Sequence, residues 1–131
     1  MISTGLKKNS KIESVILSHP VQVINWTSNV NCVPCKNQER DLSEIERTVD
    51  DRLVGIVSLP FQSYRKEFSK LGNKVLPSIN IFVQGTQMSF LDTKLHLAGQ
   101  KGYKNKPVKS LAGARSKKDL KHVVDAAEDK L

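Results

Sequence analysis

The sequence predicts an α/β layered domain with a mixed central sheet and helices on both of its faces. Short runs rich in β-branched residues alternate with segments of helical periodicity, which is typical of parallel strands joined by helices. The connections between the later predicted strands are short, and this length is compatible with antiparallel pairing. No internal repeat and no linker divides the 131 residues, so we expect one domain spanning residues 1–131.

Length and composition agree with a globular protein and argue against disorder or a fibrous class. Hydrophobic residues make up 38% of the chain and charged residues 26%, and a chain of this length buries roughly two thirds of its unfolded surface. No apolar run approaches the ~20 residues that cross a bilayer, and the N-terminus has no apolar core of the signal-peptide type. We therefore expect a cytoplasmic monomer with no membrane partner.

The first part of the chain predicts a helix, a strand and a second helix. Residues 12–16 place apolar side chains at helical spacing, and the β-branched run VQVINW, residues 21–26, has the length of a buried strand. Pro34 suits the first turn of a helix, where the missing N–H costs no hydrogen bond. Beyond it, three apolar residues recur at helical spacing: Leu42, Ile45 and Val49.

The middle of the chain predicts a strand, a helix and another strand. LVGIVSL, residues 53–59, is a second buried run, and Pro60 is expected to break it. SYRKEFSKLG, residues 63–72, has helical apolar spacing and ends on a glycine. In LPSINIFVQG, residues 76–85, apolar residues alternate before a Gln-Gly turn.

The last third predicts further strand and a closing helix. The runs TQMSFL (86–91) and TKLHLAG (93–99) are either two strands of a meander or one bent strand. Ser116, with an acid three residues later, is a variant of the capping box and starts the helix. Its apolar stripe comprises Leu120, Val123, Val124, Ala127 and Leu131.

The two cysteines of the chain, Cys32 and Cys35, lie two residues apart at the start of the predicted second helix. Such a pair can hold a metal, form a structural disulfide or cycle between redox states. In a reducing cytoplasm a lasting disulfide is disfavoured. Structural zinc needs about four ligands, and His19, His96 and His122 form no close pair that completes the set. Zinc and an inert pair are the less favoured alternatives.

The position at a helix N-terminus favours redox chemistry. The helix dipole and the unpaired N–H groups stabilise an anion, so they lower the pKa of a thiol placed there. Cys32, at the tip, would be the attacking nucleophile, and Cys35, one turn inside, would resolve a mixed disulfide. The charge of Lys36 either tunes the thiolate or is simply solvated.

Two separated motifs resemble the thioredoxin-like superfamily. CVPCK, residues 32–36, is similar to the thioredoxin active site, with Val33 in place of its usual glycine. KLGNKVLPSINIFVQG, residues 70–85, resembles the family's glycine-ended helix, its loop and the proline that opens a strand. SLAGARSKKDLKHVVDAA, residues 110–127, is similar to the last strand and closing helix.

This resemblance implies a thioredoxin-like three-layer fold and a substrate-binding surface around the cysteines. Pro77 would be the family's cis-proline facing the pair, and an X-Pro bond adopts cis at a cost of only about 0.5–1 kcal/mol. Because proline has no N–H, the backbone of Leu76 would be exposed for pairing with an extended substrate. Val33 and Pro34 would contact the same substrate.

The chain departs from thioredoxins at two further positions. Asn31 stands where they have a tryptophan before the first cysteine, and Asn25 is the only polar candidate where they keep a buried acid. The loop TSNVNCVPC, residues 27–35, is more similar to small glutaredoxin-type proteins that serve ribonucleotide reductase. Trp26, the single tryptophan, is expected in the core.

Most of the net charge of +8 is concentrated near the C-terminus. Between residues 101 and 122 there are eight lysines and arginines and one acid. This segment, with a basic loop insertion at about residues 100–110, is either a solvated surface or a contact for nucleic acid or an acidic protein. One aromatic residue, Tyr103, is too few for base stacking.

Together these features predict a thiol–disulfide oxidoreductase that reduces protein disulfides, with ribonucleotide reductase as a candidate acceptor of its electrons. It would need no bound cofactor and no metal, and it would take electrons from a thioredoxin reductase or a glutathione-type donor. The alternative is a thioredoxin-fold adaptor that binds a protein or nucleic acid through the basic segment, with the cysteines incidental.

Overall fold

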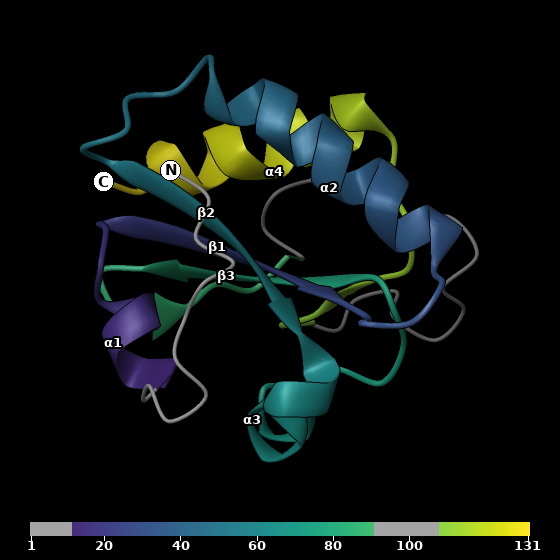
Figure 1. Ribbon diagram of the computed structural model, residues 1–131. Coiled ribbons are helices and arrows are strands. Elements are labelled where there is room, and N and C mark those ends of the chain that lie inside the picture. The colour runs from purple at the N-terminus through teal and green to yellow at the C-terminus, as the bar shows by residue number, and fades with distance from the viewer. Residues whose placement is uncertain (1–11, 91–107) are drawn as a thin grey trace.

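The computed structural model describes residues 12–90 and 108–131, and these residues form one sheet with helices on both faces (Figure 1). The elements follow the chain in the order α1 (Ile12–Ile16), β1 (Val21–Thr27), α2 (Val33–Glu46), β2 (Val54–Pro60), a 3₁₀ turn η1 (Phe61–Ser63), α3 (Arg65–Lys70), β3 (Ser78–Val83), β4 (Thr86–Gln87), β5 (Leu111–Ala112) and α4 (Lys117–Glu128). The predicted alternation of helices and strands is confirmed.

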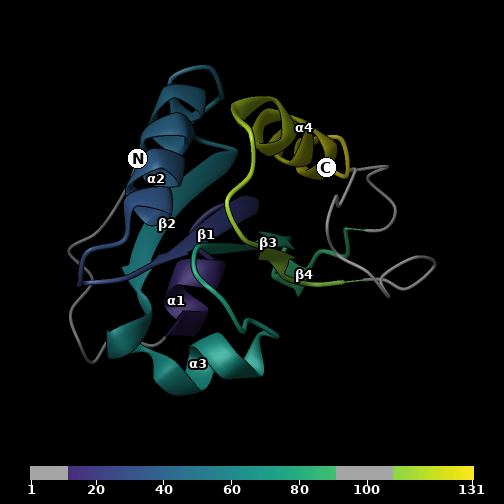
Figure 2. The same ribbon diagram turned by 90° about the vertical axis from the view of Figure 1, so that its right-hand side faces the viewer.

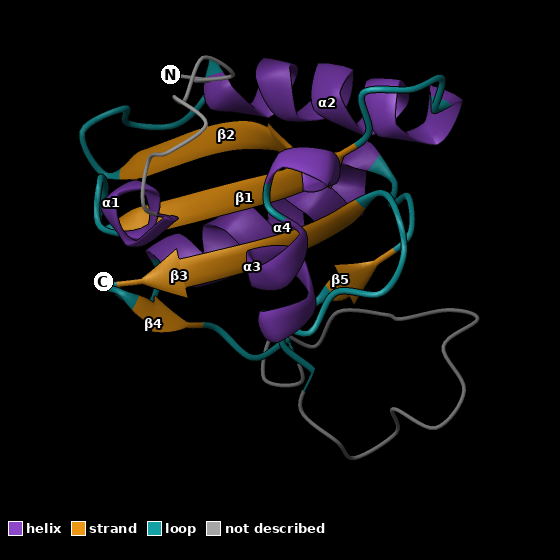
Figure 3. Cartoon of the chain, turned by 60° about the horizontal axis from the view of Figure 1, so that its bottom comes forward, coloured by secondary structure: helices purple, strands orange, loops and turns teal. Residues whose placement is uncertain are grey.

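The sheet is mixed, as the sequence predicts. Its strand order is β2-β1-β3-β4, and the short β5 also pairs with β3 (Figure 3). β1 is parallel to β2, with Val23 opposite Ile56, and antiparallel to β3, with Val23 opposite Ile81. β1 is therefore a central strand, buried on both faces.

Two apolar cores lie on opposite faces of this sheet. α2 and α4 cover one face, and α1 and α3 cover the other (Figures 1 and 2). Successive side chains of β1 point to opposite faces of the sheet, so they enter the two cores alternately. The first core includes Val23, Leu42, Ile45, Ile56, Ile81, Leu120 and Val124. The second includes Ile12, Val15, Ile24, Trp26, Leu59, Tyr64 and Phe68.

Pro60 does not break β2 but is its last residue, paired opposite Thr27. A proline is tolerated there because β2 is an edge strand and one side of its backbone needs no ladder partner.

Two apolar stripes are also shorter than predicted. α2 ends at Glu46, so Val49 packs on the core from the following turn. α4 ends at Glu128, which leaves Leu131 46% exposed.

Some predictions lie outside the described residues. They concern the run 93–99 and residues 100–107 of the basic loop insertion, including Tyr103. Of the run 86–91, the described part forms only the two-residue strand β4 before Met88 and Phe90 enter the core. Within 12–90 and 108–131, no helix has the length and apolar character that a membrane span requires.

Candidate active site

Cys32 and Cys35 form a disulfide at the N-terminus of α2. Cys32 is the N-cap, with extended backbone, and Pro34 lies in the first turn, where a proline fits without losing a hydrogen bond. The sulfur atoms are 2.04 Å apart and the Cα atoms 5.3 Å apart. Cys35 is buried at 1% exposure, whereas Cys32 is partly exposed. Only the first sulfur is thus open to a partner.

The backbone of α2 is aimed at the exposed sulfur. The N–H of Cys35 donates to Sγ of Cys32 at 3.3 Å, so the sulfur acts as the capping group of the helix. Backbone N–H groups and the positive end of a helix dipole both stabilise a thiolate. The capping geometry supplies the anion stabilisation that a nucleophilic Cys32 requires. Lys36 is exposed one turn inside the helix.

A cis peptide bond lies near the end of β1 from which the chain runs on to this helix. The bond joins Leu76 to Pro77, directly before β3. Ser78 pairs opposite Trp26 near the end of β1, and the chain leaves β1 there to reach Cys32. The N–H of Gly113 donates to the Pro77 carbonyl at 2.8 Å. Gly113 has φ +81°, a left-handed conformation that favours glycine. Figure 2 looks onto this edge of the sheet.

A buried network of neutral polar groups lies beneath α2. Gln38, at 1% exposure, donates from Nε2 to Oδ1 of Asn25 at 3.1 Å. Asn25 donates to Oγ of Ser58 at 3.3 Å. Oε1 of Gln38 accepts from the backbone N–H of Arg115 at 3.0 Å. The network joins α2, β1, β2 and the segment before α4, and it contains no carboxylate.

The sequence motifs pointed to Asn25 but not to Gln38 or Arg115. A signal for Gln38 was present, because it occupies the buried stripe of α2 one turn after Cys35, between apolar positions. Arg115 gave no such signal. Its Nη2 donates to the Ala112 carbonyl at 2.8 Å, and burial lowers its pKa, partly offset by the charge of Asp119.

A second polar network braces the loop that leads to the cis bond. Nε1 of Trp26 donates to Oδ1 of Asn80 at 2.7 Å, and Nδ2 of Asn73 donates to the same oxygen at 2.7 Å. Ser110 donates to Oδ1 of Asn73 at 2.6 Å. Trp26 is fully buried, which confirms its expected place in the core.

Apolar side chains are exposed on both sides of Cys32 in the sequence and in the loop before the cis bond. Val30 is 68% exposed, Val33 59% and Val75 47%, and they make up most of the exposed large hydrophobic residues among the described positions. Leu76 is half-buried against the second core. We call Val30, Val33, Val75 and Leu76 the apolar rim.

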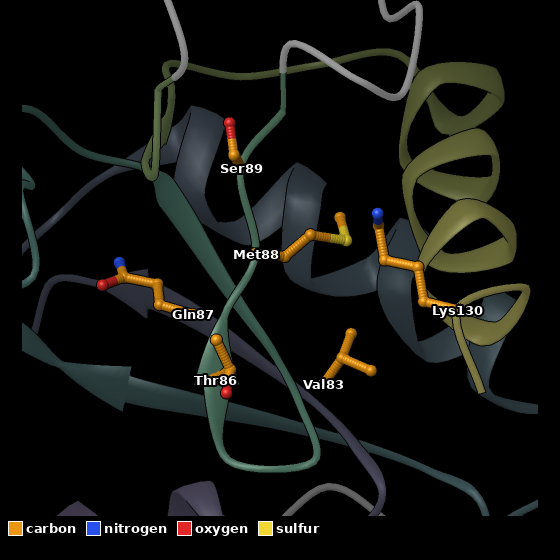
Figure 4. A pocket seen from close by; sticks show the side chains of 6 residues that line it. All are labelled: Val83, Thr86, Gln87, Met88, Ser89 and Lys130. Carbon is orange, nitrogen blue, oxygen red and sulfur yellow. The ribbon is translucent and has the colours of Figure 1, made fainter.

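One cavity of the described residues lies away from the disulfide. It has a volume of about 250 Å³ and is found between β4 and the end of α4 (Figure 4), lined by Val83, Thr86, Gln87, Met88, Ser89 and Lys130. Val83 is at the opposite end of β3 from Pro77, so this pocket does not belong to the disulfide site. In the regions that the structure describes, no three metal-binding side chains gather into a group.

The fold is that of known thioredoxins. No family model and no curated protein matches the sequence. Among solved structures, a mutant thioredoxin from Halobacterium salinarum superposes with a TM-score of 0.67 at 14% identity, covering 97% of this chain and 88% of that one. Oxidised thioredoxin from Plasmodium falciparum gives 0.65 at 14% identity, covering 95% and 97%. Chloroplastic thioredoxin z gives 0.64 at 17% identity, covering 98% and 93%. The chain therefore has the thioredoxin-like fold that its two separated motifs predict.

Proposed function

We propose that this protein is a thiol–disulfide oxidoreductase that reduces disulfides of other proteins. The observation that carries the proposal is the Cys32–Cys35 pair at the tip of α2, with the Cys35 N–H directed at the exposed Cys32 sulfur. The cis Leu76–Pro77 bond at the same edge of the sheet supports it. In this proposal Cys32 is the nucleophile and Cys35 the resolving thiol.

The reaction begins with the reduced pair. The Cys32 thiolate attacks one sulfur of the substrate disulfide, so a Cys32–substrate S–S bond forms and the substrate S–S bond breaks. The other substrate sulfur leaves as a thiolate. Cys35 then attacks Sγ of Cys32, its proton passes to the leaving sulfur, and the reduced substrate departs. Two electrons have passed to the substrate, and the pair is left as the disulfide.

We propose roles for the other predicted residues as well. The backbone of Leu76 would pair with an extended substrate, because Pro77 has no N–H and leaves the backbone of Leu76 exposed. Val33 and Pro34 would contact the substrate beside the attacked sulfur, and Val33 is exposed for this. Lys36 would favour the thiolate modestly, since charges at the surface are screened.

A thiol-based donor must return the two electrons, and we place this role with a thioredoxin reductase or a glutathione-type system in the cytoplasm. A reducing compartment keeps such a pair cycling instead of locked as a disulfide. The loop before Cys32, with Asn31 in place of tryptophan, is the basis for proposing ribonucleotide reductase among the acceptors. The proposal needs neither a bound cofactor nor a second subunit.

Reduction of insulin by a chemical dithiol, followed by turbidity, tests the activity. The wild-type protein should accelerate the reaction, and Cys32→Ser should abolish the acceleration. Cys35→Ser should accumulate a mixed disulfide through Cys32, visible as a mass increase that a dithiol removes. Acceleration that survives Cys32→Ser would refute the mechanism.

The rival function is that of an adaptor whose basic segment binds a nucleic acid or protein. Exposed Lys109 and Lys118 are the described cations that favour it. It predicts binding that is unchanged when both cysteines are replaced by serine and that weakens steeply with salt. A pull-down of wild type and the double cysteine variant at two salt concentrations separates the two functions.

A further inference from the structure

Four segments that hydrogen bonds link to one another, among them the N-terminal turns of α2, carry basic residues and no acid. They are the helix entry 28–38, the loop 60–64, the cis-proline loop 71–78 and the segment 111–118. Hydrogen bonds hold them together: Gln62 bonds to Ser28, Gly113 to Pro77, and Arg115 to Gln38. They contain no Asp or Glu, and their cations are Lys36, Lys74, Arg115, Lys117 and Lys118.

The acidic residues nearest to these segments in the sequence lie just outside them. Glu39 and Asp119 directly follow two of them, and Glu44 lies on the last turns of α2. Lys117 is turned toward that far end of α2, because it forms an ion pair with Glu44. The remaining cations of these segments are three exposed lysines, Lys36, Lys74 and Lys118. The partly buried Arg115 adds a fourth positive charge, which Asp119 offsets in part.

The apolar rim and these cations describe one kind of partner. Val30, Val33 and Val75 offer apolar contact area to a polypeptide, and a small polar disulfide would leave that area uncovered. A surface of one charge raises the encounter rate with partners of the opposite charge and disfavours partners of the same charge. We propose that the preferred substrates are proteins whose disulfide is flanked by acidic and apolar residues.

This inference rests on the proposed function and names its substrate class. Two peptide disulfides test it, identical in length and in their leucines, one with Glu and one with Lys on both sides of the cysteine. The rate with reduced wild-type protein is divided by the rate of the same peptide with dithiothreitol, which removes differences in intrinsic reactivity. We expect the Glu peptide to react about tenfold faster at low salt and the preference to shrink at about 0.5 M salt.

Charge reversal identifies the surface responsible. Lys74→Glu should reduce the preference several-fold, because Lys74 is exposed in the loop that precedes the cis bond. Arg47→Glu makes the same change in net charge at the far end of α2, and it should leave the preference unchanged. An equal loss in both variants would mean that only net charge matters, which would overturn the assignment to this surface.

The two ways of failing are distinguishable. Equal normalised rates for the two peptides, or a faster Lys peptide, would overturn the inference while insulin reduction still supports the oxidoreductase. The glutathione disulfide, which is anionic but lacks apolar residues, should react more slowly than the Glu peptide. If it reacts as fast, the apolar rim does not take part and the inference fails. No reaction with either peptide or with insulin would overturn the proposed function itself.

Discussion

Cys32 and Cys35 have different environments although only two residues separate them. Cys32 caps α2 and is partly exposed, whereas Cys35 faces the sheet at 1% exposure. One turn after Cys35 on the buried side of α2, Gln38 belongs to a network of neutral side chains that includes Asn25 and Ser58. Among the described residues this network includes no carboxylate, and the anion-stabilising group seen at Cys32 is the backbone of the helix end.

Asn25→Asp tests how strictly this network requires neutral groups. The new carboxyl would be fully buried, and desolvation raises the pKa of a buried acid above its unfolded value of about 3.9. The variant should match the wild type in stability near pH 3 and lose stability as pH rises through the raised pKa. We expect a loss of about 2–4 kcal/mol near pH 8, measured by urea unfolding.

The matched control is Asn37→Asp, which makes the same chemical change on the exposed face of α2. Its stability should differ from the wild type by no more than about 0.5 kcal/mol at both pH values. A loss in Asn25→Asp that is the same at low and high pH would show that shape, rather than charge, causes the effect.

α2 and α4 lie side by side on the face of the sheet that carries the first core, and polar side chains connect the two helices. Lys117, in the first turn of α4, holds the pKa of Glu44 on α2 below its usual value through a hydrogen bond. Both side chains are exposed, so this pair contributes little to stability. Gln38 and the N-cap Ser116 are the contacts with larger expected effects.

Gln38→Met should destabilise the protein by about 2 kcal/mol, because it leaves the buried Asn25 Oδ1 and the partly buried Arg115 N–H without these partners. It should also slow insulin reduction, since the segment that holds Gly113 against Pro77 loses its link to α2. Unfolding in urea and the turbidity assay measure the two effects. Asn37→Met, on the exposed face of the same helix, is the control that should change neither; a similar loss there would remove the special role of Gln38.

Ser116→Ala removes the side-chain cap of α4, where Oγ accepts from the Asp119 N–H at 3.1 Å. We expect a loss of about 1 kcal/mol in the free energy of unfolding, the usual cost of deleting a serine N-cap. Ser116→Asp keeps an accepting oxygen and should retain most of the stability. If both variants are equally destabilised, capping is not the reason that serine is needed.

The whole molecule is organised around β1, which contributes to both cores. Val23 belongs to the core under α2 and α4, and Ile24, its neighbour in sequence, belongs to the core over α1 and α3. Because one strand joins the two cores, loss of either should destabilise the same cooperative unit.

Val23→Ala and Ile24→Ala should therefore each lower the stability of a single transition, by about 2–4 kcal/mol. Fluorescence of Trp26, which lies in the second core, and far-ultraviolet circular dichroism should give the same midpoint in each variant. Separate midpoints in Val23→Ala would mean that the two faces unfold independently, contrary to this expectation.

The fold class, the approximate positions of most described helices and strands, and the cysteine pair at a helix start could all be predicted from the sequence. These follow from local periodicity, from proline and glycine placement and from motif spacing, which are all properties of nearby residues. Element ends were less predictable. Pro60 stays in β2 only because that strand is at the sheet edge, and Leu131 is exposed because α4 stops at Glu128.

Which groups distant in sequence come together near α2 depends on the tertiary structure. Gln38 meets Asn25 and Arg115 across separations of 13 and 77 residues. The N–H of Gly113, just after β5, donates to the carbonyl of Pro77, just before the paired strand β3. No local pattern encodes such contacts, because they depend on how the sheet brings its strand ends to one edge. The same assembly gathers cations from separate segments around one apolar rim, and for that reason the expected substrate class emerged from the structure.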